Sequence, residues 1–578
     1  MNFYITTAIA YVNGAPHIGF ALECVQADVF ARWKKLQGHD VFFSTGTDDH
    51  GAKIAKTAEQ QGREIKDIVN ENAQKFKKLT KSLNLSNDTF IQTSDQKRHW
   101  PAAQKIWKII QEKDKNLSED QKTIYKDTYK GLYCVGCEAY ITEKDLVDGK
   151  CPIHNTEPET LEEENYFFRL SKYKDDLKYL FDKGGISVTP LHRKNEILNI
   201  IDGMRDISIS RPVSSLPWGV PIPNDDSQTM YVWFEALINY LSALDFGGDE
   251  KNFRKFWENG KITHFIGKDI LKFHAILWPA ILEAVEIPLY NELFVHGYIM
   301  SHGEKMSKSV GNVVDPFELI KRFGADMVRY YLLSEILPTE DGNYTEENFY
   351  WKCNADLTNG IGNVISRVTN LVESNNFNFD KGYDDNCGDL TALELSKKIK
   401  DAISKGDREF EKIEHIASDI KETGKSDQLR DFTRDKVSDW KSAAYKYNFS
   451  EAVEEVLRIQ EFIDKLFSEV HPWELVKSDP ETAKKVLHNC LEAIRIMAYM
   501  IWPFMPETAD RIFWKLGFRT DEDEFKSKYL TENIGKIELE EELKWGSKPF
   551  KDIKKGKNLF ERIEFEFDGS EGRFKRIK

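Results

Sequence analysis

Residues 2–51 of the chain read NFYITTAIAYVNGAPHIGFALECVQADVFARWKKLQGHDVFFSTGTDDHG. Residues 2–9 are rich in β-branched and aromatic side chains, which predicts a strand, and the Asn, Gly and Pro residues of 13–16 predict a loop. Apolar residues then recur at helical spacing over 20–36, and a second strand is predicted over 41–45. This order of strand, loop, helix and strand is typical of a doubly wound parallel sheet, in which ligands bind at the carboxyl ends of the strands.

The rest of the chain divides into further α/β segments, an insert and a helical part. The stretch from Ser118 to Gly219 is turn-rich and contains a cluster of cysteines, so we interpret it as an insertion that splits the sheet. Apolar runs at 230–234, 264–267 and 293–298 resume the alternation of strands and helices, and beyond Tyr350 the apolar stripes of 452–467 and 480–501 predict a helical bundle. The predicted segments are the first half of a Rossmann-like domain (1–117), the insert (118–229), the second half (230–322), a link (323–350), the bundle (351–532) and a tail (533–578).

Composition excludes several classes of protein. A chain of 578 residues with 40% hydrophobic residues is long enough for several packed domains, and its net charge of −15 argues against binding nucleic acid over its whole surface. The longest apolar stretch contains Arg495 and Pro503 and is too short for a membrane span, and no basic residue precedes Arg32, so we expect a protein of the cytoplasm without a targeting segment. From Lys544 onward the tail is basic, which fits either a solvated end or a contact with RNA.

Two loops have compositions suited to phosphate. Gly14, His17 and Gly19 lie directly before a predicted helix, whose free N–H groups and dipole attract anions, although a histidine in this place is more often a cap or a packed residue. Residues 303–312, GEKMSKSVGN, carry Lys305 and Lys308 among small residues. Two flexible ammonium groups can follow charge onto a leaving pyrophosphate, and the alternative is a solvated lysine loop.

Three cysteines and one histidine have the spacing of a zinc site. Cys134 and Cys137 form one knuckle, and Cys151 and His154 form a second one thirteen residues later. Four protein ligands leave no open position for water, so we predict a structural Zn²⁺, one per chain, that stabilises the insert. Their grouping in a chain with an odd total of seven cysteines favours reduced thiols over disulfides.

Taken together, the histidine loop and the Lys-Met-Ser-Lys-Ser loop resemble the two signatures of class I aminoacyl-tRNA synthetases. Within that class the chain is similar, from about Tyr4 to Glu564, to the methionyl-tRNA synthetase family, and the matching stretches are 7–14, 46–51, 207–211, 231–236, 264–270, 273–274 and 296–298. The resemblance implies ATP-dependent activation of L-methionine to methionyl-adenylate and its transfer to tRNA(Met), with Mg²⁺ accompanying ATP.

The resemblance also implies roles for individual residues. The residues implied to bind methionine are Ile9, Tyr11, Asp48 (for the α-ammonium group), Trp233, Ala236, Tyr240, Ile270 and His274. Those implied to bind ATP are His17, Gly19, Gly267, Asp269, His296, Lys305 and Lys308, of which His17, Lys305 and Lys308, with Arg211, have catalytic roles. For Arg211 a salt bridge between domains is the alternative. Asn363, Arg367 and Trp473 are implied to read the anticodon, and the alternative for Trp473 is a place in the bundle core.

Two departures from the family pattern leave room for other functions. Phe20 stands where the family's signature ends in a second histidine, and Leu237 stands where relatives often have proline. Another class I synthetase is the first rival, but the enzymes for valine, isoleucine and leucine carry a larger insert and the cysteine enzyme uses zinc at its substrate. An RNA-binding protein that has lost catalysis is the second, and Phe20 is the feature that favours it. We expect a monomer.

Overall fold

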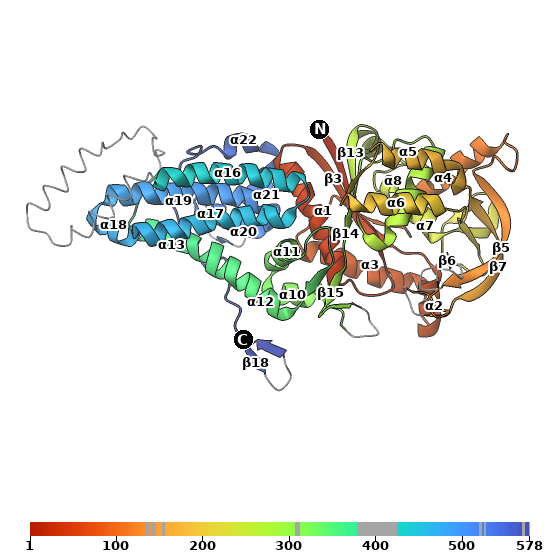
Figure 1. Ribbon diagram of the computed structural model, residues 1–578, viewed down its shortest axis with the longest axis horizontal. Helices are drawn as coiled ribbons and strands as arrows, with labels where there is room; N and C mark the ends of the chain where they lie inside the picture. The colour runs from red at the N-terminus through yellow and green to blue at the C-terminus, as the bar shows by residue number, and fades with distance from the viewer. Residues whose placement is uncertain are drawn as a thin grey trace, which may run out of the picture.

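The computed structural model describes residues 1–134, 139–141, 146–152, 156–306, 312–379, 425–518, 523–524, 528–568 and 573–576. The molecule is elongated, with an α/β part at one end and long, nearly parallel helices at the other (Figure 1). A parallel-sheet domain followed by a helical domain is what the sequence predicted. Within the described residues, no helix is long and apolar enough to cross a membrane.

The central sheet is parallel and has β1 (Asn2–Thr7) in its interior, where all but the first residue of the strand are buried. The strand order is β2-β3-β1-β13-β14-β8, with β4 also paired to β3. These strands are β2 (Ala10–Tyr11), β3 (Asp40–Asp48), β4 (Thr89–Gln92), β8 (Ser187–Thr189), β13 (Gly260–Gly267) and β14 (Glu292–His296). Because β8 comes from the range expected for the insert, the insert contributes an edge strand to the main sheet.

Helices cover the sheet and include the predicted first helix, α1 (Ile18–Leu36), which is buried along almost its whole length. The others of the α/β part are α2 (Ala52–Gln61), α3 (Ile65–Ser82), α4 (His99–Asp114), α5 (Lys174–Asp182), α6 (His192–Gly203), α7 (Val232–Leu237), α8 (Asn239–Ser242), α9 (Trp278–Ala284), α10 (Pro316–Phe323) and α11 (Ala325–Ser334). A small sheet made of β15 (Ile299–Ser301), β16 (Glu304–Lys305) and β17 (Gly342–Tyr344) lies beside α10 (Figure 1).

The insert is antiparallel. Its main sheet has the order β6-β5-β7-β9, from β5 (Ile124–Cys134), β6 (Ala139–Ile141), β7 (Glu159–Phe168) and β9 (Ile207–Ser208). A second sheet joins β10 (Ser210–Pro212), β11 (Pro221–Ile222) and β12 (Asp225–Met230). The turns that join these antiparallel strands agree with the turn-rich composition from which we predicted an insertion.

Residues 230–234, an apolar run in which we expected strands and helices to alternate, contain the end of a strand and the start of a helix. The strand β12 ends at Met230, Tyr231 is the N-cap residue of α7, and the helix then takes up residues 232–237. A short apolar run rich in aromatic and β-branched residues has the same pattern in a buried helix as in a buried strand. The consequence is functional, because the turn places Trp233 and Glu235 on a helix.

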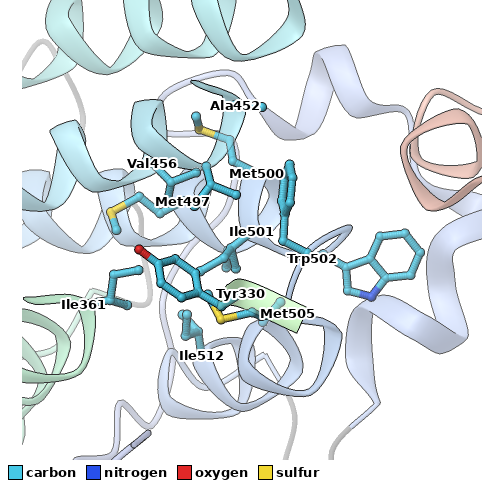
Figure 2. Close-up of a cluster of buried hydrophobic side chains, with 14 of the residues drawn as sticks. Tyr330, Ile361, Ala452, Val456, Met497, Met500, Ile501, Trp502, Met505 and Ile512 are labelled. Carbon is cyan, nitrogen blue, oxygen red and sulfur yellow. The ribbon is translucent and has the colours of Figure 1, made fainter. Parts of the chain in front are cut away.

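The helical domain contains both of the predicted long helices. Residues 452–467 lie within α17 (Phe449–Val470), and the range 480–501 coincides with α19 (Pro480–Ile501), whose N-cap Asp479 accepts a hydrogen bond from Thr482 N at 3.2 Å. The other helices are α12 (Glu346–Lys352), α13 (Asn363–Ser374), α16 (Lys425–Tyr445), α18 (Pro472–Ser478), α20 (Pro506–Lys515), α21 (Tyr529–Asn533) and α22 (Leu539–Glu542). Methionines of α19 fill the core together with Tyr330 and Ile361 (Figure 2).

Part of the basic tail is packed rather than solvated. Phe550, Leu559, Phe560 and Ile563 are each at most 6% exposed and join the core of the helical domain. The side chain of Asn354 holds this part of the tail through two hydrogen bonds to the backbone of Ile563, at 2.9 and 3.0 Å. The apolar residues among the lysines therefore anchor this segment, which a reading of charge alone did not reveal.

A buried ion pair joins α1 to α11, and its arginine also contacts the helical domain. Arg329 of α11 lies 2.8 Å from Asp28 and donates hydrogen bonds to the carbonyl groups of Pro503 and Phe504. Burial alone raises the pKa of Asp28, but the charges of Arg32 and Arg329 outweigh it and lower the pKa to about 2. The carboxylate is therefore ionised throughout the physiological pH range.

Candidate active site and anticodon-binding surface

Four parallel strands end at the same edge of the central sheet. Ile9 follows β1, Asp48 ends β3, Gly267 ends β13 and His296 ends β14. Residues implied to bind methionine and residues implied to bind ATP therefore meet at this edge, as expected for the carboxyl ends of a doubly wound sheet.

His17 is the N-cap of α1. Its Nδ1 accepts a hydrogen bond from Gly19 N at 3.1 Å, so the neutral ring carries its hydrogen on Nε2. A Cβ atom at Gly19 would lie only 2.9 Å from this ring, which explains why glycine occupies the position. An exposed imidazole with a fixed Nε2–H, placed at a helix N-terminus, is suited to donate to a phosphate oxygen.

Phe20 belongs to a small apolar cluster. Its ring packs edge-on against Phe76 of α3, with centroids 5.0 Å apart, in a group that also includes Val12, Ile54 and Val69. The side chain is half-buried, so its surroundings are those of a packing residue.

We expect Phe20→His to leave adenylate formation no faster than in the wild type, because an imidazole in this apolar cluster loses solvation without gaining a partner. Phe20→Leu, which keeps the contact apolar, is the matched control and should retain the wild-type rate within about threefold. Rapid-quench measurement of adenylate formation checks both. An acceleration of tenfold or more by Phe20→His would mean that the wild-type site is catalytically weakened.

Glu23 is a site residue that sequence reasoning missed. It faces His296 with 2.9 Å between Oε2 and Nε2, while His296 Nδ1 donates to the carbonyl of Gly297 at 2.7 Å. Burial alone lowers the pKa of His296, but the hydrogen bond and charge of Glu23 outweigh it and raise this pKa. A glutamate between the apolar residues Leu22 and Cys24 was the available signal.

Gly267 and Asp269 complete this corner. A Cβ atom at Gly267 would lie 2.8 Å from Asp269 Oδ1 and 3.7 Å from the His296 ring, so glycine allows the two polar side chains to approach each other. The exposed Asp269 carboxylate and the Glu23–His296 pair offer hydrogen-bonding groups suited to sugar hydroxyls.

The residues implied to bind methionine include a hydrogen-bonded chain of Tyr240, His274 and Ile270. The Tyr240 hydroxyl donates to His274 Nε2 at 2.7 Å, and His274 Nδ1 donates to the Ile270 carbonyl at 3.1 Å. Burial lowers the pKa of His274 to about 4, so the ring is neutral at physiological pH. Trp233 stacks on Phe273 with a centroid distance of 3.8 Å. A neutral, aromatic surface of this kind suits a polarisable thioether.

Asp48 supplies the negative charge nearest to this surface along β3. Its side chain is buried, the Thr93 hydroxyl donates to Oδ1 at 3.5 Å, and Tyr11 is its partner in the β2–β3 ladder. A buried carboxylate beside an apolar pocket is the arrangement expected for an α-ammonium group.

Arg211 lies where the insert meets α2. Its guanidinium stacks 4.4 Å above the ring of Tyr231 and donates to Ser208 Oγ at 2.7 Å. The side chain lines a cavity of about 630 Å³ that extends along α2 past Arg63. The cavity gives a substrate a route to this charge.

Lys305 ends β16 and is exposed, with its ammonium group 4.7 Å from the ring of Tyr298. Lys268, which sequence reasoning did not single out, approaches the same ring at 4.3 Å and is held by Asp341 at 2.7 Å. Lys308 lies outside the described residues.

Two of the four predicted zinc ligands, Cys134 and Cys151, lie within the described residues. Cys134 ends β5, and both it and Cys151 are buried, each with 1% exposure. Cys137 and His154 lie outside the described residues, so the four-ligand site stays a prediction.

The residues expected to read the anticodon lie in the helical domain, with Arg367 and Trp473 close together. Trp473, on α18, has 40% of its surface exposed, so it is not part of the bundle core. The Arg367 guanidinium lies 6.0 Å from its ring and is held by Asp464 at 2.5 Å, and the exposed Asn363 lies one helical turn before Arg367 on α13. Helix α18 lies at the end of the bundle farthest from the sheet (Figure 1).

Comparison with known proteins identifies the families to which the α/β part and the helical domain are similar. A model described as tRNA synthetases class I (M) matches residues 3–157 and 125–369, and one described as the anticodon binding domain of methionyl tRNA ligase matches residues 416–564. The methionine–tRNA ligase of Thermotoga maritima is 36% identical over 98% of this chain and 81% of its own, and that of Clostridium acetobutylicum is 39% identical over 90% and 74%.

Solved structures agree with these matches. The Mycobacterium tuberculosis methionyl-tRNA synthetase in complex with methionyl-adenylate superposes with a TM-score of 0.81 at 31% identity, over 97% of this chain and 99% of that one. Its ligand-free form gives a TM-score of 0.75. The agreement extends over sheet, insert and bundle alike, and the chain belongs to the methionyl-tRNA synthetase family of class I aminoacyl-tRNA synthetases.

Proposed function

We propose that this protein activates L-methionine with ATP and transfers it to tRNA(Met). In the first step a methionine carboxylate oxygen attacks the α-phosphorus of ATP, the bond from that phosphorus to the bridging oxygen breaks, and pyrophosphate leaves. In the second step a ribose hydroxyl of the terminal adenosine attacks the carbonyl carbon of the adenylate, and AMP leaves. The observation that carries the proposal is the meeting of a buried carboxylate, a neutral aromatic surface and a phosphate-suited helix N-terminus at one sheet edge.

In this proposal the chain's own residues position and stabilise charge. Asp48 receives the α-ammonium group, and Tyr240 and His274 lie at the thioether. His17 donates from Nε2 to a phosphate, and Lys305 and Lys308 follow the charge onto pyrophosphate. Mg²⁺ accompanies the ATP and neutralises part of the phosphate charge when bound.

The decisive experiment is ATP–pyrophosphate exchange with each of the twenty amino acids. Exchange that depends on methionine supports the proposal, and exchange with valine, isoleucine, leucine or cysteine assigns another class I activity. If no amino acid supports exchange, the activation step is absent, and the protein is assigned a noncatalytic RNA-binding role.

We also propose that the insert holds one structural Zn²⁺. Three thiols and one imidazole form a donor set typical of zinc, and Cys134 and Cys151 are buried as such ligands are. Zinc supplies a cross-link when bound, and no step of the reaction passes through it.

We expect Cys134→Ser to lose most of the zinc and to weaken the insert, because a hydroxyl replaces a thiolate ligand. Metal analysis together with limited proteolysis of the insert measures both effects. Cys490→Ser, at a fully buried cysteine of α19, is the matched control and should keep its zinc. Wild-type protein purified without zinc, or unchanged zinc in Cys134→Ser, would contradict the site.

A further inference from the structure

A buried network of polar side chains connects the loop after β3 with three helices, α4, α7 and α8, beside the proposed methionine pocket. His50 Nδ1 lies 2.8 Å from one carboxylate oxygen of Glu235, and His99 Nε2 lies 2.7 Å from the other. His99 Nδ1 lies 3.0 Å from Ser242 Oγ. Each of these four side chains belongs to a residue with 0% exposure.

Hydrogen-bond directions indicate how the charges are balanced. Ser242 donates its own hydrogen to the carbonyl of Asn239 at 3.2 Å, so its oxygen accepts from His99 Nδ1–H. His99 thus lies between Ser242 and Glu235, with one ring nitrogen toward each. Burial alone raises the pKa of Glu235, but His50 and His99 outweigh it and lower this pKa, so the carboxylate is charged. A fully buried, ionised carboxylate is destabilised when either hydrogen-bonding partner is removed.

Three residues of this polar network have the same sequence spacing from residues proposed to bind methionine. His50 follows β3, Glu235 is on α7 and Ser242 is on α8, and α8 packs against both α4 and α7. Each of these three residues stands two positions after a proposed methionine contact, and the pairs are Asp48 and His50, Trp233 and Glu235, and Tyr240 and Ser242.

We propose that Glu235 is a positioning residue for methionine, which holds the Asp48 loop and the Trp233 helix at a fixed separation through His50 and His99. The inference rests on the proposed function. Asp48 binds one end of the amino acid and Trp233 contacts the other, so a shift of one segment against the other spoils the fit. A displacement of about 1 Å can cost on the order of 10²-fold in a positioned site.

Binding of ATP does not depend on this network. The ATP corner is built by His17, Glu23 and His296, and none of the hydrogen bonds described for Glu235 reaches these residues. Loss of the network therefore separates the two substrates, whereas a general loss of structure affects both.

The test is Glu235→Gln, which keeps the shape and removes the charge. We expect methionine affinity, measured by calorimetric titration, and the methionine KM in pyrophosphate exchange to weaken by about 10- to 100-fold, with the ATP KM within about twofold. Glu492→Gln is the matched control, since Glu492 is another fully buried carboxylate, 2.7 Å from Arg495 in the helical domain. It should leave the methionine KM unchanged.

A milder variant guards against a folding defect. Ser242→Ala removes the hydroxyl that faces His99 and its local hydrogen bond to Asn239, leaves Glu235 and both histidines in place, and should raise the methionine KM by about 2- to 10-fold. Folded variants that bind methionine as tightly as the wild type, or whose two KM values rise together, would overturn the positioning role while methionine-dependent exchange still stands. Wild-type protein that binds no methionine would overturn the proposed function, and this inference with it.

Discussion

Lys305→Ala should slow the formation of methionyl-adenylate by at least ~10²-fold and leave methionine affinity unchanged. The charge that an ammonium group stabilises here appears on the leaving pyrophosphate and is absent from bound methionine. Lys305 is exposed at the end of β16, beside β15, and its ammonium group lies 4.7 Å from the centre of the Tyr298 ring. Single-turnover kinetics with saturating ATP measures the rate, and calorimetry measures the affinity.

The control for this variant is Lys321→Ala, which removes an exposed lysine from α10 and should change neither quantity. Lys308→Ala is expected to behave as Lys305→Ala does. Equal losses of rate and methionine affinity in Lys305→Ala would point to a folding defect and would remove the residue from the catalytic set.

Trp473→Ala should weaken charging of tRNA(Met) by about 5- to 150-fold, the effect of ~1 to 3 kcal/mol from one lost stacking contact. Pyrophosphate exchange should stay at the wild-type level, because α18 lies at the opposite end of the molecule from the sheet (Figure 1). The exposed ring and the Arg367 guanidinium 6.0 Å from it are groups suited to unstacked bases. Aminoacylation kinetics over a range of tRNA concentrations provides the measurement.

Two variants make this experiment specific. Trp473→Phe keeps a ring for stacking and should show an intermediate loss, whereas Tyr179→Ala removes another exposed aromatic residue, 68% exposed on α5, and should charge normally. Normal charging by folded Trp473→Ala would assign the tryptophan to the periphery of the bundle.

Periodicity predicted the long elements well, since α1 and α19 each bury a large apolar surface over many turns. Residues 230–234 were predicted only as part of an alternation of strands and helices, because five apolar residues are too few to distinguish a buried helix from a buried strand. The difference lies in Tyr231, whose extended backbone is the N-cap of α7. Local sequence does not show that a chain turns there.

The sequence predicted the parts of the site that lie in one contiguous segment. It did not predict the parts that are formed by residues far apart in the sequence. The His17 loop is a contiguous segment, and the apolar periodicity of the residues after it predicted that a helix begins there. Glu235 meets His50 and His99 over separations of 185 and 136 residues, and no spacing rule covers such distances. Charged residues flanked by apolar neighbours, such as Glu23 and Glu235, were the signal available in the sequence.

The ion pair between Asp28 and Arg329 has a consequence for the distance between the α/β part and the helical domain. Asp28 is on the helix that begins beside His17, and Arg329 is bonded to the turn that ends α19. Breaking such a buried pair costs on the order of 3 to 5 kcal/mol, and the Arg329 that it fixes is hydrogen-bonded to Pro503 and Phe504. We therefore expect the α/β part and the helical domain to keep a constant separation, and a tRNA with a lengthened anticodon arm to be charged less efficiently than one of normal length.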